Sequence, residues 1–186
     1  LVELDLSDNA LTDIPGQAFS GTPALRQLKL SGNSISLISA NAFTYTPSIV
    51  SLDISDSKVT RVAPEAFQAL SLLETLHLAD NKLRELPAKM LNSLGAIHNL
   101  DVQGNPWACN CRALLPLWRL LRKLKVSIPT LQSCEYPIKL DSLQLFNDST
   151  EKEFGCPPEI IPGNRFKESV EGDNSSLSCE FLGDPA

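Results

Sequence analysis

The residues of this chain whose spacing points most directly to chemistry are its five cysteines. Cys109 and Cys111 form a C-x-C pair, and Cys134, Cys156 and Cys179 follow at wide intervals. Cysteines in such patterns are found as zinc ligands or as disulfides. The spacing does not supply two C-x-x-C knuckles and neither histidine lies nearby, so we interpret these cysteines as disulfide partners. Because disulfides persist in oxidising compartments, this favours an extracellular protein.

The histidines, serines and carboxylates of this chain do not form a known catalytic motif. The sequence has no phosphate-binding loop, no H-E-x-x-H and no G-x-S-x-G motif. Its two histidines, His77 and His98, fall on predicted strands of an open sheet, where no apolar cleft would tune a carboxylate for acid–base work. We therefore expect a protein that is not an enzyme and that uses no cofactor and no metal.

The amino-acid composition limits the class of protein to which this chain can belong. The chain has 186 residues, of which 42% are hydrophobic and 20% charged, which is typical of a folded chain with one ordinary domain or two small ones. Its 22 acidic and 16 basic residues give a net charge of −6, which is unfavourable for nucleic-acid binding. No run approaches the roughly 18 apolar residues of a membrane span. Membrane attachment would therefore need a segment downstream of this sequence.

Leucine occurs 31 times, and its distribution is strictly periodic. The pattern L-x-x-L-x-L-x-x-N-x-L begins at Leu1 and returns at equal intervals, at Leu25, Ile49, Leu73 and Ile97. Each copy offers one short strand that cannot bury its apolar side chains alone, whereas stacked copies share a continuous core. A second apolar pair in each copy should fill that core from the opposite side. These pairs are Ile14 with Phe19, Ile38 with Phe43, Val62 with Phe67, and Leu86 with Leu91.

Over residues 1–105 this pattern resembles the leucine-rich repeat family, in the form typical of animal extracellular proteins. The resemblance implies an α/β solenoid with a parallel β-sheet on its concave face. A polar position of the repeat predicts an asparagine ladder, in which buried amides satisfy backbone groups of the turns. Its members are Asn9, Asn33, Asn81 and Asn105. Ser57 takes this position in the third repeat, and its hydroxyl predicts a weaker turn.

After the repeats, an N-P-W sequence leads into C-x-C-x22-C-x21-C. This arrangement resembles the cysteine-rich C-terminal cap of extracellular leucine-rich proteins and would occupy residues 106–156. Four cysteines allow three pairings. The resemblance implies Cys109 with Cys134 and Cys111 with Cys156.

The end of the last repeat needs a cover, because its apolar side chains have no further repeat to pack against. Trp107 is one candidate for this cover. Leucines at helical spacing between Leu114 and Val126 predict a second, a helix that begins near Leu115. Pro116 suits the first turn of such a helix.

Residues 157–186 differ in composition and begin with a stiff Pro-Pro junction. Leu177, Cys179 and Phe181 alternate along a predicted strand. This segment resembles the opening of an immunoglobulin-like domain that stops after its second strand. The resemblance implies an incomplete β-sandwich in which Cys179 is half of an inter-sheet disulfide whose partner is absent from this sequence. We therefore expect the chain to be part of a longer protein.

Two surfaces are candidates for binding. The central column of the concave sheet alternates in charge and could bind protein, although it could equally be an ordinary solvated face. Its residues are Asp5, Lys29, Asp53, His77 and Asp101. A basic patch on the predicted cap could contact heparan sulfate weakly, or could be the ordinary solvent-exposed face of the cap helix. It comprises Arg112, Arg119, Arg122, Lys123 and Lys125.

The order of repeats, cap and immunoglobulin-like segment resembles the kekkon, LINGO and AMIGO groups of animal receptors. The resemblance implies a single-pass protein of the plasma membrane, whose extracellular part presents a rigid curved surface to protein ligands or co-receptors. Sequons at Asn147 and Asn174 agree with glycosylation in that compartment. The alternative is a secreted matrix or innate-immune recognition protein.

Overall fold

The computed structural model describes residues 1–108, 114–127, 159–160 and 181–182. Most of the predicted cap and of the predicted immunoglobulin-like segment lies outside these ranges. The same is true of several predicted site residues, which are Cys109, Cys111, Cys134, Cys156, Cys179, Asn147, Asn174 and Arg112.

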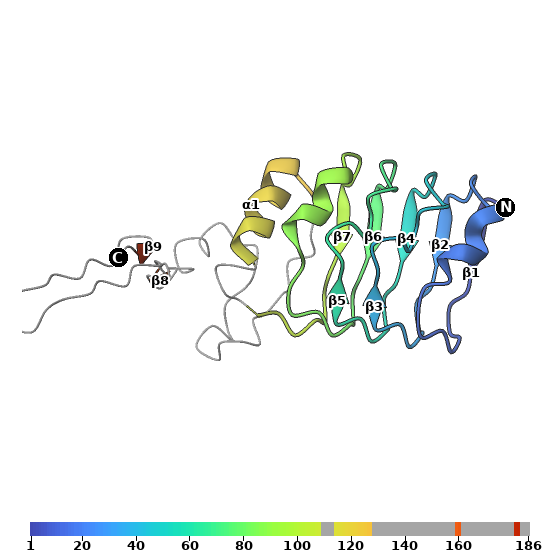
Figure 1. Cartoon of the computed structure of the whole chain (residues 1–186), viewed down its shortest axis with the longest axis horizontal. Coiled ribbons are helices and arrows are strands. Elements are labelled where there is room, and N and C mark those ends of the chain that lie inside the picture. Colours follow the sequence, from blue (N-terminus) through green and yellow to red (C-terminus); the bar gives the residue numbers. More distant parts are fainter. Residues whose placement is uncertain (109–113, 128–158, 161–180, 183–186) are drawn as a thin grey trace, which may run out of the picture.

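Five short strands form one parallel sheet in the order β1-β2-β4-β6-β7 (Figure 1). They are β1 (Glu3–Asp5), β2 (Gln27–Lys29), β4 (Ser51–Asp53), β6 (Thr75–His77) and β7 (Asn99–Asp101). Each strand pairs with the next at an offset of one repeat, so that Leu4 lies beside Leu28 and Leu28 beside Leu52. The parallel sheet predicted from the repeat period is confirmed.

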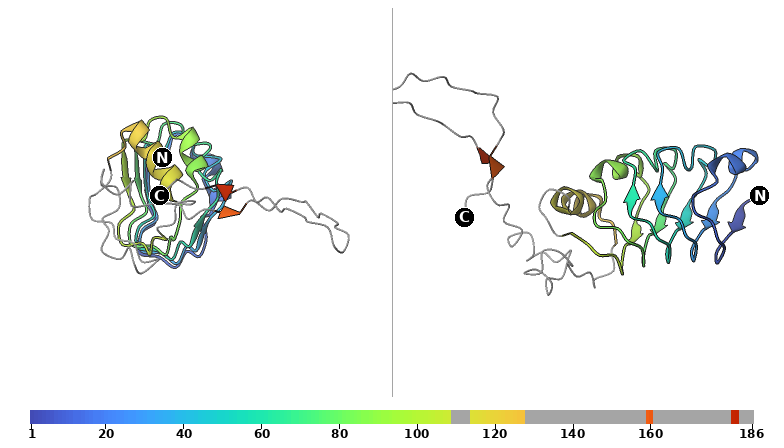
Figure 2. Two further views of the ribbon diagram at one scale, coloured as in Figure 1. Left: turned by 90° about the vertical axis from the view of Figure 1, so that its left-hand side faces the viewer. Right: turned by 60° about the horizontal axis from the view of Figure 1, so that its bottom comes forward.

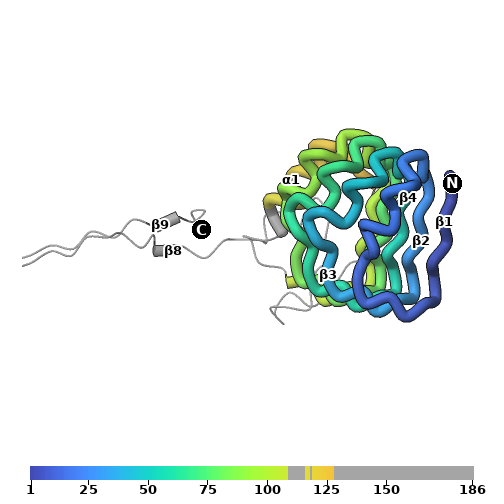
Figure 3. The backbone as a smooth tube through the Cα atoms, turned by 45° about the vertical axis from the view of Figure 1, so that its right-hand side comes forward, coloured from blue at the N-terminus to red at the C-terminus, as the bar shows by residue number. Residues whose placement is uncertain are grey.

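The opposite wall of the solenoid is built from short strands and 3-10 helices. β3 (Leu37–Ile38) pairs in parallel with β5 (Arg61–Val62), while η1 (Gly16–Gly21) and η2 (Ala88–Ser93) are 3-10 helices. The tube in Figure 3 shows how each coil runs from the main sheet to this wall and back. Tight turns of this kind let every coil close within a single repeat.

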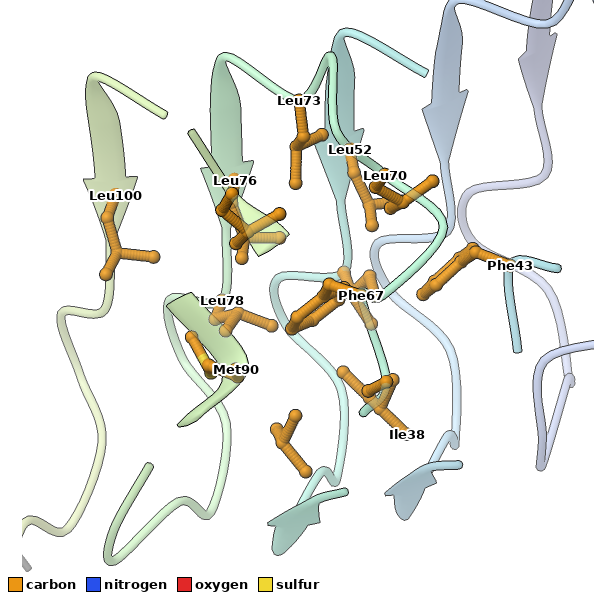
Figure 4. Packing of buried hydrophobic residues seen from close by; sticks show 14 of the residues in the cluster. Ile38, Phe43, Leu52, Phe67, Leu70, Leu73, Leu76, Leu78, Met90 and Leu100 are labelled. Atoms are coloured by element: carbon orange, nitrogen blue, oxygen red, sulfur yellow. The ribbon is translucent and has the colours of Figure 1, made fainter. Parts of the chain in front are cut away.

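The core lies between the two walls and is continuous along the solenoid. The middle residue of each of the strands β2, β4, β6 and β7 points inward and is at most 1% exposed, whereas its neighbours point outward. From the other wall, the rings of Phe43 and Phe67 stack with centroids 5.8 Å apart (Figure 4). Burial of each such side chain is worth about 1.5–3 kcal/mol, so the stacked coils stabilise one another.

A lid covers the core beyond β7. Helix α1 (Leu114–Leu124) begins one residue before the predicted start, with Pro116 in its first turn. Leu117 and Leu121 of this helix are each 1% exposed and join the core cluster, as does Trp107. After the helix, Ser127 extends the sheet: its N–H donates to the His98 carbonyl at 2.7 Å. The helix lies at the end of the solenoid in both views of Figure 2.

Hydrogen bonds from three of the residues at the polar position join their coils to the coil before. Asn33 Oδ1 accepts the N–H of Leu11 at 3.0 Å, and its Nδ2 donates to the Leu6 carbonyl at 3.0 Å. Asn81 and Asn105 make the same pair of contacts one coil back. All three side chains are buried, so these amides satisfy backbone groups that would otherwise lack partners.

Two members of this column differ from the rest. Asn9 is exposed and donates to the carbonyls of Leu6 and Ser7 in its own coil, because no described coil packs on that side of it. Ser57 is buried, and within the described residues its Oγ has no hydrogen-bond partner. The hydroxyl is too short to reach the preceding coil as an amide does.

The residues before the polar position share a left-handed backbone. The value of φ there lies between +47° and +67°, which favours Gly, Asn and Asp. These residues are Asp8, Gly32, Asp56, Asp80 and Gly104. At both glycines the carboxylate of the aspartate one coil earlier occupies the space that a Cβ would need.

In the tail, β8 (Glu159–Ile160) pairs antiparallel with β9 (Phe181–Leu182). The strand predicted around Cys179 overlaps β9 at Phe181.

Candidate protein-binding surface on the concave sheet

The outward face of the five-stranded sheet, here called the concave face, gathers residues that lie one repeat apart in sequence. The register brings the predicted central column together, with Asp5 beside Lys29, Lys29 beside Asp53, Asp53 beside His77, and His77 beside Asp101. Adjacent parallel strands are about 4.8 Å apart, so each aspartate of the column has Lys29 or His77 as its neighbour.

Two pairs in the column are within ion-pair distance. Lys29 Nζ lies 3.7 Å from Asp5 Oδ2, with both side chains more than half exposed. His77 Nδ1 lies 3.9 Å from Asp101 Oδ2, where the side chains are 36% and 25% exposed. Exposed pairs of this kind contribute little stability, about 0–1 kcal/mol. Their main effect is to neutralise the face locally.

The aspartates of the column also hold the turn that follows each strand. Oδ1 of Asp5, Asp53 and Asp101 accepts the N–H of the residue two positions later, at 2.9–3.2 Å. This is the local bond that aspartate favours in turns. In Asp5 and Asp101, Oδ1 therefore accepts the backbone N–H of the turn, while Oδ2 faces Lys29 or His77 on the neighbouring strand. These residues have a structural role as well as the predicted surface role.

The surroundings of Asp5 lower the pKa of its carboxyl. Hydrogen bonds from Ser7, first from its side chain and then from its N–H, lower the pKa of the Asp5 carboxyl, and the positive charge of Lys29 lowers it further. Asp5 thus stays ionised to lower pH than an ordinary aspartate.

Two columns flank the central one and add polar groups and small apolar ones. They are Glu3, Gln27, Ser51, Thr75 and Asn99, and Val2, Arg26, Val50, Glu74 and His98. Glu74 Oε2 lies 3.9 Å from His98 Nε2, which gives a second carboxylate–imidazole pair beside that of His77. Val2 is 53% exposed at the open side of the sheet. None of the residues in the three outward columns is aromatic. The face therefore offers a polar surface in which acidic and basic side chains alternate, without a large apolar anchor.

The predicted basic patch lies elsewhere, on the lid. Arg119, Arg122 and Lys123 are exposed on α1, and Lys125 is exposed just after it. The patch and the concave face are therefore separate surfaces in the described part of the chain.

The described residues contain no group of three His, Cys, Asp or Glu side chains placed to hold a metal ion. No helix within the described ranges is long and apolar enough to cross a membrane. The absence of catalytic activity stays a prediction.

Comparison with protein families decides what kind of solenoid this is. Residues 1–57 and 47–106 each match the leucine rich repeat family, and the two matches together cover more than half of the chain. The chain belongs to the leucine-rich repeat family.

Two similar leucine-rich repeat proteins share part of this chain. The human leucine-rich repeat and fibronectin type-III domain-containing protein 4 is 39% identical over 88 residues, which is 47% of this chain and 13% of that protein. A Danio rerio leucine-rich repeat and fibronectin type III domain-containing protein 1-like protein is 38% identical over 87 residues, with 46% and 12% covered. The chain thus corresponds to a small part of these relatives, whose names describe domains and no reaction. Those names include a fibronectin type III domain, and the immunoglobulin-like segment stays a prediction.

A solved structure shows the same leucine-rich repeat fold. The Toll–Spatzle complex of Drosophila contains a chain that matches with a TM-score of 0.55 and 22% identity, over 59% of this chain and 15% of that one. At this identity the likeness establishes the fold.

Some functional contacts were not predicted from the sequence. The dual role of Asp5 and Asp101 depends on which oxygen faces which neighbour, and spacing cannot show this. The left-handed column of Asp8, Gly32 and their equivalents could have been found, because every residue in it is Asp or Gly at a constant offset from the repeat leucines.

Proposed function

We propose that this chain is part of the extracellular region of a cell-surface receptor or adhesion protein, and that the concave face binds a protein ligand or co-receptor. The observation that carries the proposal is the strict register of the five strands, which presents outward side chains in fixed columns. A face held in place by a buried core loses little conformational entropy on binding.

The alternating charges favour specificity for a partner with the opposite order of charges. Lys29 lies between Asp5 and Asp53, and His77 lies between Asp53 and Asp101. A partner whose acidic groups meet Lys29 and whose basic groups meet Asp5 and Asp53 would gain complementarity, while a shifted one would meet like charges.

In this proposal residues 1–105 are the repeats, 106–156 a cap with disulfides Cys109–Cys134 and Cys111–Cys156, and 157–186 the start of an immunoglobulin-like domain. The antiparallel pairing of β8 with β9 supports the last assignment, since the first two strands of such a sandwich also pair in this way. Glycans on Asn147 and Asn174, and a membrane span downstream, belong to the same proposal.

The proposal is tested by binding of the 186-residue chain to an array of extracellular proteins. The double variant Arg26→Glu and Lys29→Glu changes two exposed cations of the concave face. It should weaken binding of any genuine ligand at least tenfold. The matched control, Arg61→Glu with Lys89→Glu, makes the same charge change outside the three columns and should bind as the parent does.

Two results would count against this assignment. If both double variants bound equally well, the concave face would not be the binding surface. If a full-length protein proved to be released into the medium with no membrane-anchored form, the secreted matrix or innate-immune alternative would replace the receptor assignment.

A further inference from the structure

Charge is strongly segregated along this acidic chain. Residues 102–134 contain no aspartate or glutamate, although the chain has 22 acidic residues, and they hold five of its 16 basic ones. Four of these five lie in or directly after α1, which makes this helix the most positive element of the described structure.

Helix α1 separates its cations from its core contacts. Leu117 and Leu121 are buried in the solenoid end, while Arg119, Arg122 and Lys123 are exposed. At about 100° per residue these three cations lie opposite the two leucines, on the surface that faces away from the sheet. Figures 1 and 2 show the helix at the end of the solenoid, beyond β7. The exposed cations on its side away from the core therefore belong to the outer end surface of the described solenoid.

The fold also fixes a fourth cation beside this surface. Lys125 adopts φ +55°, and its N–H donates to the Arg122 carbonyl at 3.1 Å. Val126 then bonds back to the Leu121 carbonyl, and Ser127 joins the edge of β7. The chain that carries Lys125 is thus held against the end of the helix.

The negative end of the helix dipole accounts for only part of this arrangement. Basic residues in the last turn, here Arg122 and Lys123, are stabilised by the carbonyl groups at the helix C-terminus. Arg119 lies outside the last turn, where the effect of the dipole is small. A run of cations without an intervening carboxylate makes this part of the chain attractive to a polyanion.

We propose that the cationic face of α1, formed by Arg119, Arg122, Lys123 and Lys125, binds a linear sulfated polysaccharide. Arg119, Arg122 and Lys123 extend over about 6 Å, at roughly 1.5 Å of helix per residue, which suits successive sulfate and carboxylate groups of one short glycan segment. The described side chains at these four positions are exposed and cationic, which favours a densely charged polyanion. This site goes beyond the proposed function, because it lies apart from the concave face and binds independently of it.

Heparin affinity chromatography of the 186-residue chain tests the proposal. We expect elution above the physiological salt concentration of about 0.15 M, with affinity that falls steeply as salt rises. The triple variant Arg119→Gln, Arg122→Gln and Lys123→Gln should lose at least tenfold in affinity and elute below that concentration. The matched control, Lys58→Gln, Lys82→Gln and Lys89→Gln, removes three exposed cations from the repeats and should elute with the parent.

Competition and spectroscopy complete the test. Heparin should displace the bound chain, while desulfated heparin and polyglutamate should not. Equal competition by polyglutamate would overturn the proposal in favour of an acidic protein partner, and early elution of the parent chain would overturn it outright. Circular dichroism should show unchanged secondary structure in both triple variants, so that a loss of binding reports the charges.

Discussion

Asn81 Oδ1 accepts the N–H of Val59 in the preceding coil at 2.9 Å, across 22 residues of sequence. The Nδ2 of the same amide donates to the Ile54 carbonyl at 2.8 Å. One side chain therefore satisfies a donor and an acceptor of another coil in the dry interior. Stacking thus depends on hydrogen bonds at the turns as well as on the apolar core.

The first prediction concerns the loss of this amide. Asn81→Ala should lower the free energy of unfolding by about 2–4 kcal/mol, because the buried N–H of Val59 and the carbonyl of Ile54 would both lose their partner. Chemical denaturation of the purified chain measures the change. Asn9→Ala is the control: Asn9 is exposed and bonds within its own coil, so its removal should cost less than about 1 kcal/mol. Equal losses in the two variants would contradict the structural role of the buried amide.

The second prediction restores the amide that the third coil lacks. Asp56 already has the left-handed backbone that precedes the polar position in the other coils. Ser57→Asn should therefore reach the Ile35 N–H and the Leu30 carbonyl, as Asn33 and Asn81 reach their equivalents. We expect an increase in unfolding free energy of about 1–2 kcal/mol. Ser57→Ala, which removes a hydroxyl without a partner among the described residues, should be close to neutral. A destabilised Asn variant would show that the site cannot accommodate the larger side chain.

The third prediction concerns the left-handed turns. Gly104 has φ +63°, and a Cβ there would meet the carboxylate of Asp80. Gly104→Ala should destabilise the chain by about 1–3 kcal/mol, through backbone strain and this contact together. At exposed Gly95 a Cβ meets no atom within 4 Å, so Gly95→Ala should change stability by less than about 0.5 kcal/mol.

A double-mutant cycle separates the two contributions at Gly104. In an Asp80→Ala background the cost of Gly104→Ala should decrease, because the carboxylate contact is gone, but it should not vanish, because the backbone strain remains. Full recovery would mean that strain contributes nothing at this turn.

The fourth prediction is the low pKa of Asp5. NMR titration should find the pKa of this carboxyl below that of aspartate in an unfolded peptide, and Ser7→Ala should raise it more than Lys29→Gln does. Since the folded pKa is lower than the unfolded one, the ionised form of Asp5 stabilises the fold at neutral pH. That contribution disappears as the pH falls through the lowered pKa. An Asp5 pKa at or above the unfolded value would contradict the hydrogen bonding described at this turn.

The sequence could predict the repeat geometry because a single period fixes several features at once. Leu28, Leu52 and Leu76 recur once in every repeat, so one register places them all on the inner side of the sheet. The start of α1 was predicted to within one residue from the positions of its leucines and Pro116.

Other features depend on neighbours that spacing does not specify. Asn9 has the sequence position of a ladder residue, yet it is exposed, because burial requires a coil on both sides. The aspartates of the concave face were predicted as binding residues. That their Oδ1 atoms hold turns depends on three-dimensional geometry, which a list of charged positions cannot reveal.

The proposed function requires that a disulfide-bonded cap closes an extracellular leucine-rich repeat solenoid. Peptide mapping by mass spectrometry of the chain secreted from animal cells, under non-reducing conditions, tests it most directly. The account predicts peptides joined through Cys109–Cys134 and Cys111–Cys156. Free thiols at these four positions, or a stoichiometric zinc ion bound by them, would contradict it.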